Sequence, residues 1–570
     1  MNHVLTYLDL ADSLLCSLPS RARIAGSPKL PCIRTFRIRV DRTMPFEFVA
    51  NSMSPFCGLW EADVCFDYSD YDSALSGIGG ETQADVYIIW LDWRIYASSM
   101  SAQEAAHWLN ERIVKLRMVT DKPIWINNWP ESLEDANRVL SFRASDRGWF
   151  RKLNSYLLGA VENNTGCVLI DLAQLAHEGT ESFYDYRNEE ISNYPFSNQA
   201  TTIISRHLGV HLLPASCVPR LKAIALDLDD TLYQGVLGEE GAEGVTLTEG
   251  HHRLQRLLLK LKQSGLLLTL CSRNEEDDVK ALFDTRSDFP LRWDDFAAVC
   301  ANWQTKAENL NRLAQLLNID PSAFLFVDDN PAELVKMAAA LPEVRLLRAK
   351  RNGEETMLGL CYFPGLYQHH QDDIAVSRTT DIQANQAREK IRQTASDFHS
   401  YLDSLNMVIT IYENEASHVK RLYDLSHKTN QFNLALRRMT ENEANDVMDA
   451  SKYITITVGL SDILSDSGII GTFVCRLDGE QAHLIETLFS CRALGRDIET
   501  VAFAWILEKL MDRGVQRIHI EMSQGPRNAP ALDWIKRFVE GSPEQLPLKD
   551  LYARVKAACG NHPARVEVNR

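Results

Sequence analysis

Two carboxylates, Asp227 and Asp229, follow the apolar run at residues 224–226. In an extended chain, residues two apart point to the same side, so these two carboxylates face together whereas Asp230 points away. One carboxylate can then attack phosphorus while the other handles protons, provided that a cation suppresses their repulsion. Mg²⁺ suits this role because it binds a few carboxylates, waters and substrate phosphate. The pair therefore predicts a magnesium-dependent phosphoryl-transfer site, and an acidic turn after a strand is the simpler alternative.

Three further groups follow along the chain in the order that such a site needs. Ser272 ends an apolar run, where its hydroxyl can hold a phosphate oxygen. Lys306 opens a predicted helix, and its ammonium can offset the charge of Asp227 and of the phosphate. Asp328 and Asp329 end another apolar run and can supply oxygen ligands to the metal. A helix cap, a solvated lysine and an acidic turn would explain each group alone, but their order indicates one site.

The elements predicted around these residues would bring them to one edge of a sheet. Apolar runs predict strands at 223–226, 266–270 and 323–327, and periodic patterns predict helices at 250–263, 275–283 and 306–317. Strands that alternate with helices favour a parallel sheet with right-handed crossovers. The carboxyl ends of such strands meet at one edge, where α/β proteins bind ligands. We therefore expect a catalytic unit at residues 221–349.

The interval between Thr231 and Ser272 is short, and a loop, a helix and a strand account for most of it. A lid is the usual means of excluding water from a small substrate. The lack of room for a large lid predicts an open site, which suits a substrate that another protein carries. A lidless phosphatase is the simpler alternative.

Together these residues resemble the four motifs of the haloacid-dehalogenase superfamily, which match Asp227-x-Asp229-x-Thr231, Ser272, Lys306 and Asp328-Asp329. The chain is more similar still to the FkbH-like branch through residues 229–239, 271–274, 326–333, 429–433 and 490–496. The resemblance extends over roughly residues 30–540. Tyr233-Gln234 stands where that branch commonly has Trp-Gly, a departure that we place outside the chemical core.

Membership of that branch implies Mg²⁺ as cofactor and glyceryl transfer as activity. A phosphorylated three-carbon acyl donor would lose phosphate, and its glyceryl group would pass to the phosphopantetheine thiol of an acyl carrier protein. The resemblance assigns catalysis to Asp227, Asp229, Ser272 and Lys306, and metal binding to Asp227, Asp229, Asp328 and Asp329. We also expect Thr231, Arg273 and Asn274 to contact the substrate. A phosphatase that hydrolyses an aspartyl-phosphate and a non-enzymatic scaffold for carrier proteins remain as alternatives.

An enzyme-bound thioester would require a reactive cysteine near the phosphate site. Cys271 is our first choice because it adjoins Ser272 and Arg273, and a helix N-terminus could lower its pKa. The period of two argues the other way, since a phosphate-facing Ser272 would turn Cys271 toward the sheet as a buried, inert thiol. Cys491, beside Arg492, is the second choice, and direct transfer without a thioester is the third.

Residues 1–215 form a first predicted unit, which resembles a degenerate SGNH-hydrolase-type domain. Its patterns predict strands at 36–40, 86–90, 123–126 and 168–170 and helices at 102–116 and 147–158. Ser52 lacks a Gly-Asp-Ser setting, and the stretch at 184–187 lacks the aspartate–histidine pair that a serine hydrolase needs. We therefore expect partner docking or a structural role, followed by a proline-containing linker at 211–220.

Residues 385–570 form the last predicted unit, which resembles the GNAT acyltransferase fold, after an irregular connector at 350–384. Its patterns predict a long helix at 382–405, strands at 408–412, 453–458, 469–476, 483–489 and 517–521, and helices at 418–426, 440–450 and 498–513. In that fold, backbone amides cradle a pyrophosphate, so Arg492 and Gly495 would contact the ligand and Asn430 would add an amide donor. Asp497 would repel a phosphate, which disfavours coenzyme A and leaves carrier-borne phosphopantetheine open.

Composition bounds the partners of this 570-residue chain. The apolar content of 45% is that of a globular protein, and the length suggests about three domains. A net charge of −17 argues against nucleic acid, which requires clustered cations. The apolar runs are too short to span a membrane, and no signal peptide is evident, so we expect a cytoplasmic protein. The twelve cysteines show neither a disulfide framework nor zinc-ligand spacing.

Overall fold

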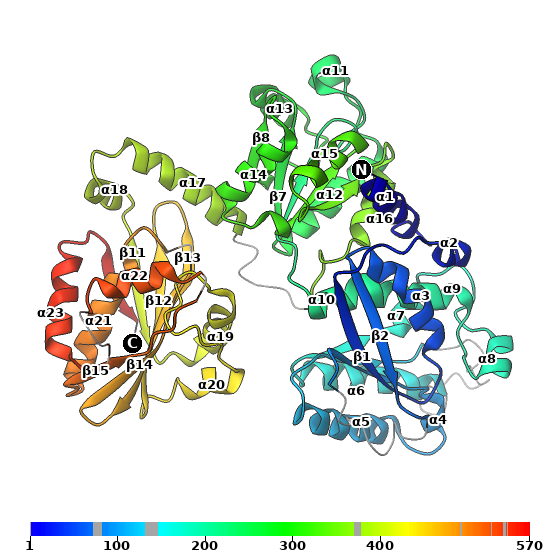
Figure 1. The fold of residues 1–570 in the computed structure, drawn as a ribbon, viewed down its shortest axis with the longest axis horizontal. Helices are drawn as coiled ribbons and strands as arrows, with labels where there is room; N and C mark the ends of the chain where they lie inside the picture. The colour runs from blue at the N-terminus through cyan, green and yellow to red at the C-terminus, as the bar shows by residue number, and fades with distance from the viewer. Residues whose placement is uncertain are drawn as a thin grey trace. The chain divides into compact units, whose positions relative to one another are not determined.

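A computed structural model describes residues 2–71, 83–130, 146–369, 378–490, 493–525, 527–539, 543 and 545–569. The chain divides into two compact units, residues 1–376 and 377–570 (Figure 1). The first unit contains two five-stranded sheets and the second contains one seven-stranded sheet. The predicted multidomain α/β architecture is confirmed. No helix within the described ranges is long and apolar enough to cross a membrane.

The first sheet is parallel throughout, in the order β2-β1-β3-β4-β5. Its strands are β1 (Arg34–Arg42), β2 (Ala62–Tyr68), β3 (Val86–Trp90), β4 (Ile124–Asn127) and β5 (Cys167–Ile170), and its longer helices are α1 (Asn2–Leu14), α3 (Glu47–Gly58), α5 (Ala102–Arg117), α6 (Asp146–Glu162) and α9 (Asn198–Arg206). The four predicted strands are confirmed. The sequence did not indicate β2, an edge strand whose side chains are mostly half-buried or exposed.

The linker expected at 211–220 is wrong over most of its length. Residues His207–Leu212 form a π-helical turn, which continues into α10 (Leu213–Cys217). Pro214 lies at the start of α10, directly after this π-helical turn and within continuous helical backbone. The side chains of Leu208, Leu212 and Leu213 are buried. This segment therefore belongs to a helix in the core and is not a linker, and both sheets of this unit share one continuous hydrophobic core.

The second sheet is also parallel, in the order β10-β9-β6-β7-β8. Its strands are β6 (Ala223–Leu226), β7 (Leu267–Ser272), β8 (Phe296–Ala301), β9 (Phe324–Asp328) and β10 (Arg345–Arg348), and its helices include α11 (Leu237–Gly244), α12 (Glu249–Gln263), α13 (Glu276–Thr285), α14 (Lys306–Leu317) and α15 (Pro331–Ala340). The chain runs from β6 outward on one side to β7 and β8, then returns to β9 on the other side. The crevice at the carboxyl end of β6 is therefore the topological switch point, where such sheets bind ligands.

The segment expected as an irregular connector begins with a helix, α16 (Gly353–Cys361), which packs against α12. Glycines permit the close approach of the two helix starts. A Cβ added at Gly353 would lie 2.6 Å from the backbone nitrogen of His251, and one at Gly250 would lie 2.7 Å from that of Glu354. The same glycines that suggested irregular chain instead serve close helix packing.

The second unit has a mixed sheet in the order β16-β15-β14-β13-β12-β11-β17. Its strands are β11 (Val408–Glu413), β12 (Tyr453–Ser461), β13 (Asp466–Asp478), β14 (Gln481–Phe489), β15 (Arg517–Ile520), β16 (Leu546–Pro547) and β17 (Arg565–Asn569), and its helices include α17 (Arg378–Thr394), α18 (Phe398–Ser404), α19 (Val419–Lys428), α20 (Glu441–Asp446), α21 (Ile498–Asp512), α22 (Ala529–Lys536) and α23 (Leu548–Cys559). The five predicted strands and three predicted helices between 408 and 521 are confirmed within a few residues. The single helix expected at 382–405 is instead two, because Asp397 starts α18 by accepting a hydrogen bond from the Ser400 N–H.

Candidate active site

Three buried side chains meet at the carboxyl edge of the second sheet. Asp227 directly follows β6, Asp328 ends the neighbouring β9, and Lys306 is the first residue of α14. Thr305 and Glu308 cap that helix with reciprocal hydrogen bonds, which fixes where Lys306 begins its turn. Lys306 Nζ lies 2.8 Å from Asp227 Oδ2 and 2.5 Å from Asp328 Oδ2. The sequence prediction that these three residues come together agrees with this geometry.

The charges of this triad depend on one another. Burial raises the pKa of Asp227 and Asp328, and the Lys306 ammonium pulls both back toward the charged form. Burial alone would lower the pKa of Lys306, but its two carboxylate partners raise it, so the ammonium stays charged. The arrangement holds Asp227 as a desolvated carboxylate beside a fixed cation, which suits a nucleophile that must attack an anionic phosphate.

Asp227, Asp328 and Asp329 form a cluster that could hold a metal ion. Each offers one carboxylate oxygen, and these atoms lie within 4.8 Å of one another. Burial raises the pKa of Asp329, and nearby Asp227 raises it further. Lys306 supplies one positive charge against three carboxylates, so a divalent cation with a preference for oxygen ligands would balance the cluster. The residues therefore fit Mg²⁺.

Asp229 is not a member of that cluster, although we expected it as a metal ligand. Its carboxylate accepts hydrogen bonds from the Tyr233 hydroxyl at 2.7 Å, the Leu237 N–H at 2.9 Å and the Asn274 amide at 3.0 Å. Burial and the adjacent Asp229 raise the pKa of Tyr233, so its hydroxyl keeps its proton and donates. Asp230 adopts a left-handed conformation with φ 49° and accepts from the Gly235 N–H. Asp230 thus holds the turn, in agreement with the expectation that it faces away.

The remaining residues predicted near the phosphate lie around this network in different environments. Ser272 ends β7, is 1% exposed, and accepts a hydrogen bond from Asn274 at 3.0 Å. Asn274 is thus engaged by Ser272 and Asp229. Arg273 lies at the exposed rim and pairs with Glu333 at 3.3 Å. Thr231 is fully buried, and its hydroxyl has no hydrogen-bond partner among the described residues.

The structure contradicts the choice of Cys271 as the acyl anchor. Its side chain is fully buried on the face of β7 opposite to Ser272, and its thiol donates to the Lys306 carbonyl oxygen at 3.4 Å. Burial raises the pKa of the Cys271 thiol well above its ordinary value, which disfavours the thiolate that nucleophilic attack requires. The alternation along the strand explains this placement. Cys491 and Arg492 lie outside the described residues.

The ligand contacts expected in the second unit lie on polar loops. Asn430 is exposed, and its side-chain oxygen accepts a hydrogen bond from Arg438 at 2.6 Å. Gly495 adopts a φ of +80°, two residues before Asp497 begins α21. The Asp497 carboxylate accepts from Thr500 at 2.8 Å and lies 3.4 Å from Arg537.

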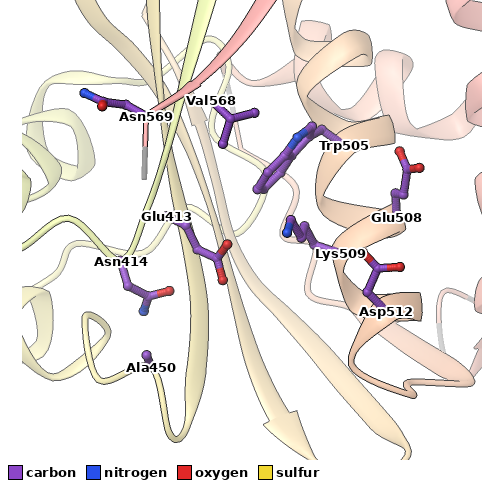
Figure 2. A pocket seen from close by; sticks show the side chains of 9 residues that line it. All are labelled: Glu413, Asn414, Ala450, Trp505, Glu508, Lys509, Asp512, Val568 and Asn569. Atoms are coloured by element: carbon purple, nitrogen blue, oxygen red, sulfur yellow. The ribbon is translucent and has the colours of Figure 1, made fainter.

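A pocket of about 520 Å³ in the second unit lies between α21 and the ends of β11 and β17. Figure 2 shows Glu413 on one side of it and Trp505 and Lys509 on the other. Lys509 Nζ lies 5.3 Å from the centre of the Trp505 ring, and Glu413 pairs with Arg513 at 3.3 Å. No residue predicted from the sequence lines this pocket.

Sequence reasoning missed Tyr233. We placed its departure from the common Trp-Gly outside the chemical core, and the structure corrects that placement, because the hydroxyl touches Asp229. Nothing in the local pattern reveals this contact, since it depends on the turn that follows β6, in which Asp230 is left-handed. In the domain of the first sheet, Ser52 lies within helix α3 and makes no described hydrogen bond to a histidine. Asp185 caps the N-terminus of α8 (Tyr186–Ser192). The non-catalytic role expected for that domain stays a prediction.

No protein-family model matches this chain, and no curated protein resembles it in sequence. Among solved structures, the N-terminal part of the protein BF1531 from Bacteroides fragilis, which contains a phosphatase domain complexed with Mg, is 21% identical at a TM-score of 0.49, covering 60% of this chain and 95% of that one. The ribosomal-protein-S18-alanine N-acetyltransferase from Escherichia coli is 12% identical at 0.19, covering 22% of this chain and 74% of that one. N-acetylglutamate synthase from Neisseria gonorrhoeae is 10% identical at 0.19, with 93% of each chain covered. These similarities assign no family.

Proposed function

We propose that the second sheet carries a Mg²⁺-dependent phosphatase site that works through an aspartyl-phosphate. The observation that carries this proposal is the buried contact of Lys306 with both Asp227 and Asp328 at the switch point of a parallel sheet. Burying a lysine between two carboxylates costs free energy of folding unless the three charges are well paired or serve a function. Here Lys306 lies directly beside Asp227, the carboxylate that we propose as the nucleophile, and beside Asp328.

In the first step, an oxygen of Asp227 attacks phosphorus and the bond from phosphorus to the leaving oxygen breaks. Asp229 gives its proton to that oxygen. In the second step, water attacks the aspartyl-phosphate, the bond between phosphorus and the Asp227 oxygen breaks, and Asp229 takes the proton of the water. Lys306 holds its ammonium beside Asp227 through both steps, and Ser272 holds a phosphate oxygen.

Asp227, Asp328 and Asp329 would hold Mg²⁺, which when bound supplies positive charge between the carboxylates and the incoming phosphate. The three carboxylates would fix the position of this charge. Burial raises the pKa of all three carboxyls, and the Lys306 ammonium opposes this shift in each of them.

We further infer that the substrate is a three-carbon acyl donor that carries both an acyl phosphate and a phosphate ester. The site at Asp227 hydrolyses the phosphate ester, and the phosphopantetheine thiol of an acyl carrier protein attacks the acyl carbon, so that the bond from this carbon to the acyl-phosphate oxygen breaks, phosphate leaves and the glyceryl thioester forms. Two observations support this finer proposal. Residues 227–266 are all described, and α11 and α12 are their only helices between β6 and β7, which leaves no room for a large lid on this side of the site. Arg273 lies at the exposed rim beside Ser272, where a cation can meet an anionic partner.

The deciding experiment incubates the full chain with Mg²⁺, an enzymatically generated acyl-phosphate donor and a holo-carrier, and then reads intact masses and free phosphate. We expect phosphate release together with a mass increase of one glyceryl group on the carrier. Phosphate release without carrier acylation would leave a phosphatase of a small metabolite. No phosphate release, with carrier binding retained, would leave a scaffold.

A further inference from the structure

The hydrogen bonds to Asp229 fill one of its two oxygens. A carboxylate oxygen has two lone pairs. Oδ1 accepts from the Tyr233 hydroxyl at 2.7 Å and from the Leu237 N–H at 2.9 Å, whereas Oδ2 accepts only from Asn274 at 3.0 Å. Among the described residues, Oδ2 therefore keeps one lone-pair site free.

The chain after Asp229 is shaped to deliver both donors. Tyr233 lies four residues on, and Gly235 then adopts a φ of +115°, which turns the chain back so that Leu237, at the start of α11, presents its N–H to the same oxygen. A Cβ at Gly235 would lie 2.7 Å from Glu240 Oε1, so glycine also fits the packing. The Tyr233 ring is 0% exposed and packs 5.8 Å from the Phe289 ring. The hydroxyl is thus held by a buried ring that cannot swing away.

Asn274 ties this arrangement to the phosphate position. Its amide nitrogen donates to Asp229 Oδ2 and also to Ser272 Oγ, each at 3.0 Å. The free site on Oδ2 consequently lies on the side of Asp229 that is linked to Ser272, the residue proposed to hold a phosphate oxygen.

We infer that Tyr233 is a positioning residue that fixes the Asp229 carboxylate with Oδ2 as the oxygen that exchanges the proton with the substrate. This inference rests on the proposed phosphatase function. Tyr233 itself touches no reacting atom and acts through Asp229. Its removal lets the carboxylate rotate, so that the proton is no longer delivered along one direction to the leaving oxygen.

The test compares kcat/KM for two phosphate monoesters in the wild type and in Tyr233→Phe, which keeps the buried ring. An alkyl phosphate such as glycerol 3-phosphate needs a proton on its leaving oxygen, whereas p-nitrophenyl phosphate has a leaving group that departs without one. We expect kcat/KM to fall about 10-fold for the alkyl phosphate, as for other residues that orient a catalytic ligand, and to stay nearly unchanged for p-nitrophenyl phosphate. Equal losses on both substrates, or no loss on either, would overturn the inference.

Two further variants separate positioning from a general structural effect. Tyr194→Phe removes another buried hydroxyl, which bonds Thr201 at 2.9 Å in the first sheet's domain, and we expect it to leave both values unchanged. In an Asp229→Asn background, adding Tyr233→Phe should not lower kcat/KM for the alkyl phosphate any further. A further loss of about 10-fold, as in the wild-type background, would contradict action through Asp229.

If Tyr233→Phe fails to fold, Asn274→Ala removes the third donor to Asp229 without disturbing the buried ring. Because Asn274 also donates to Ser272, we expect a loss on both esters that is larger on the alkyl phosphate. An equal loss on both substrates would overturn the inference there too. A wild-type chain that hydrolyses neither ester in the presence of Mg²⁺ would overturn the proposed function, and the inference with it. Hydrolysis by the wild type with no selective loss in the variants would overturn the inference alone.

Discussion

Lys306 is the residue on which the charge balance of the site depends. It compensates Asp227 and Asp328, both of which are buried beside it. Lys306→Met keeps the length of the side chain but leaves two carboxylates without a partner, and we expect the free energy of unfolding to fall by about 3–5 kcal/mol. Urea unfolding of the full chain measures this loss. Lys280→Met, at an exposed position on α13, serves as the control, and an equal loss in both variants would contradict the account.

Asp329 allows the metal proposal to be tested without breaking the ion pairs of Lys306. It is half-buried and belongs to the carboxylate cluster, but it does not pair with Lys306. Asp329→Asn should raise the Mg²⁺ concentration needed for half-maximal phosphate release by roughly 10-fold, because one charged oxygen ligand is lost. An unchanged Mg²⁺ requirement, or full activity in excess chelator, would exclude this metal site.

At the scale of elements, the strand ends that carry the chemistry could be predicted because each is an apolar run that stops at polar residues. β6 and α14 begin and end where the sequence indicates. β8 and β10 escaped notice because one is rich in alanine and the other is four residues with an arginine at each end. The contact of Tyr233 with Asp229 could not be predicted, since it depends on the turn after β6, in which Asp230 is left-handed, and on the packing of the Tyr233 ring against Phe289.

The junction of α12 and α16 gives a prediction at this scale. Gly353→Ala would place a methyl group 2.6 Å from the His251 backbone nitrogen. Backbone cannot move aside as a side chain can, so we expect a loss of about 1–3 kcal/mol in the free energy of unfolding. Gly159, inside α6, has nothing within 4 Å of an added Cβ, so Gly159→Ala should instead stabilise by about 0.5–1 kcal/mol. Stabilisation by both variants in thermal unfolding would refute the close contact.

In the first unit as a whole, two half-buried histidines, His207 and His211, connect the π-helical turn after α9 to the end of α16. His211 Nε2 lies 2.8 Å from the Cys361 carbonyl oxygen, and its Nδ1 lies 3.3 Å from that of His207. Burial, with nearby Arg206 as a smaller cause, lowers the pKa of His207 to about 3 and that of His211 to about 4. Both rings are therefore neutral in the folded protein at neutral pH.

This pair gives the unit a pH-dependent stability with a defined sign. An unfolded histidine has a pKa of about 6.5, so the unfolded chain binds more protons than the folded one below that pH. The contribution is complete above about pH 6.5 and is lost as the pH falls toward about 4. We expect His211→Gln, which can still donate to the Cys361 carbonyl, to flatten the decline of the unfolding free energy over this window. An unchanged slope would show that other groups cause it.

The central claim is that Asp227 is the nucleophile of a phosphatase site. The most direct measurement is Mg²⁺-dependent phosphate release by Asp227→Asn, with Asp284→Asn, at an exposed position on α13, as the matched control. The amide keeps the shape of the side chain but cannot attack phosphorus. The account predicts that release is abolished in Asp227→Asn while the thermal unfolding transition persists, and that the control releases phosphate at the wild-type rate. Near-normal turnover by folded Asp227→Asn would contradict it.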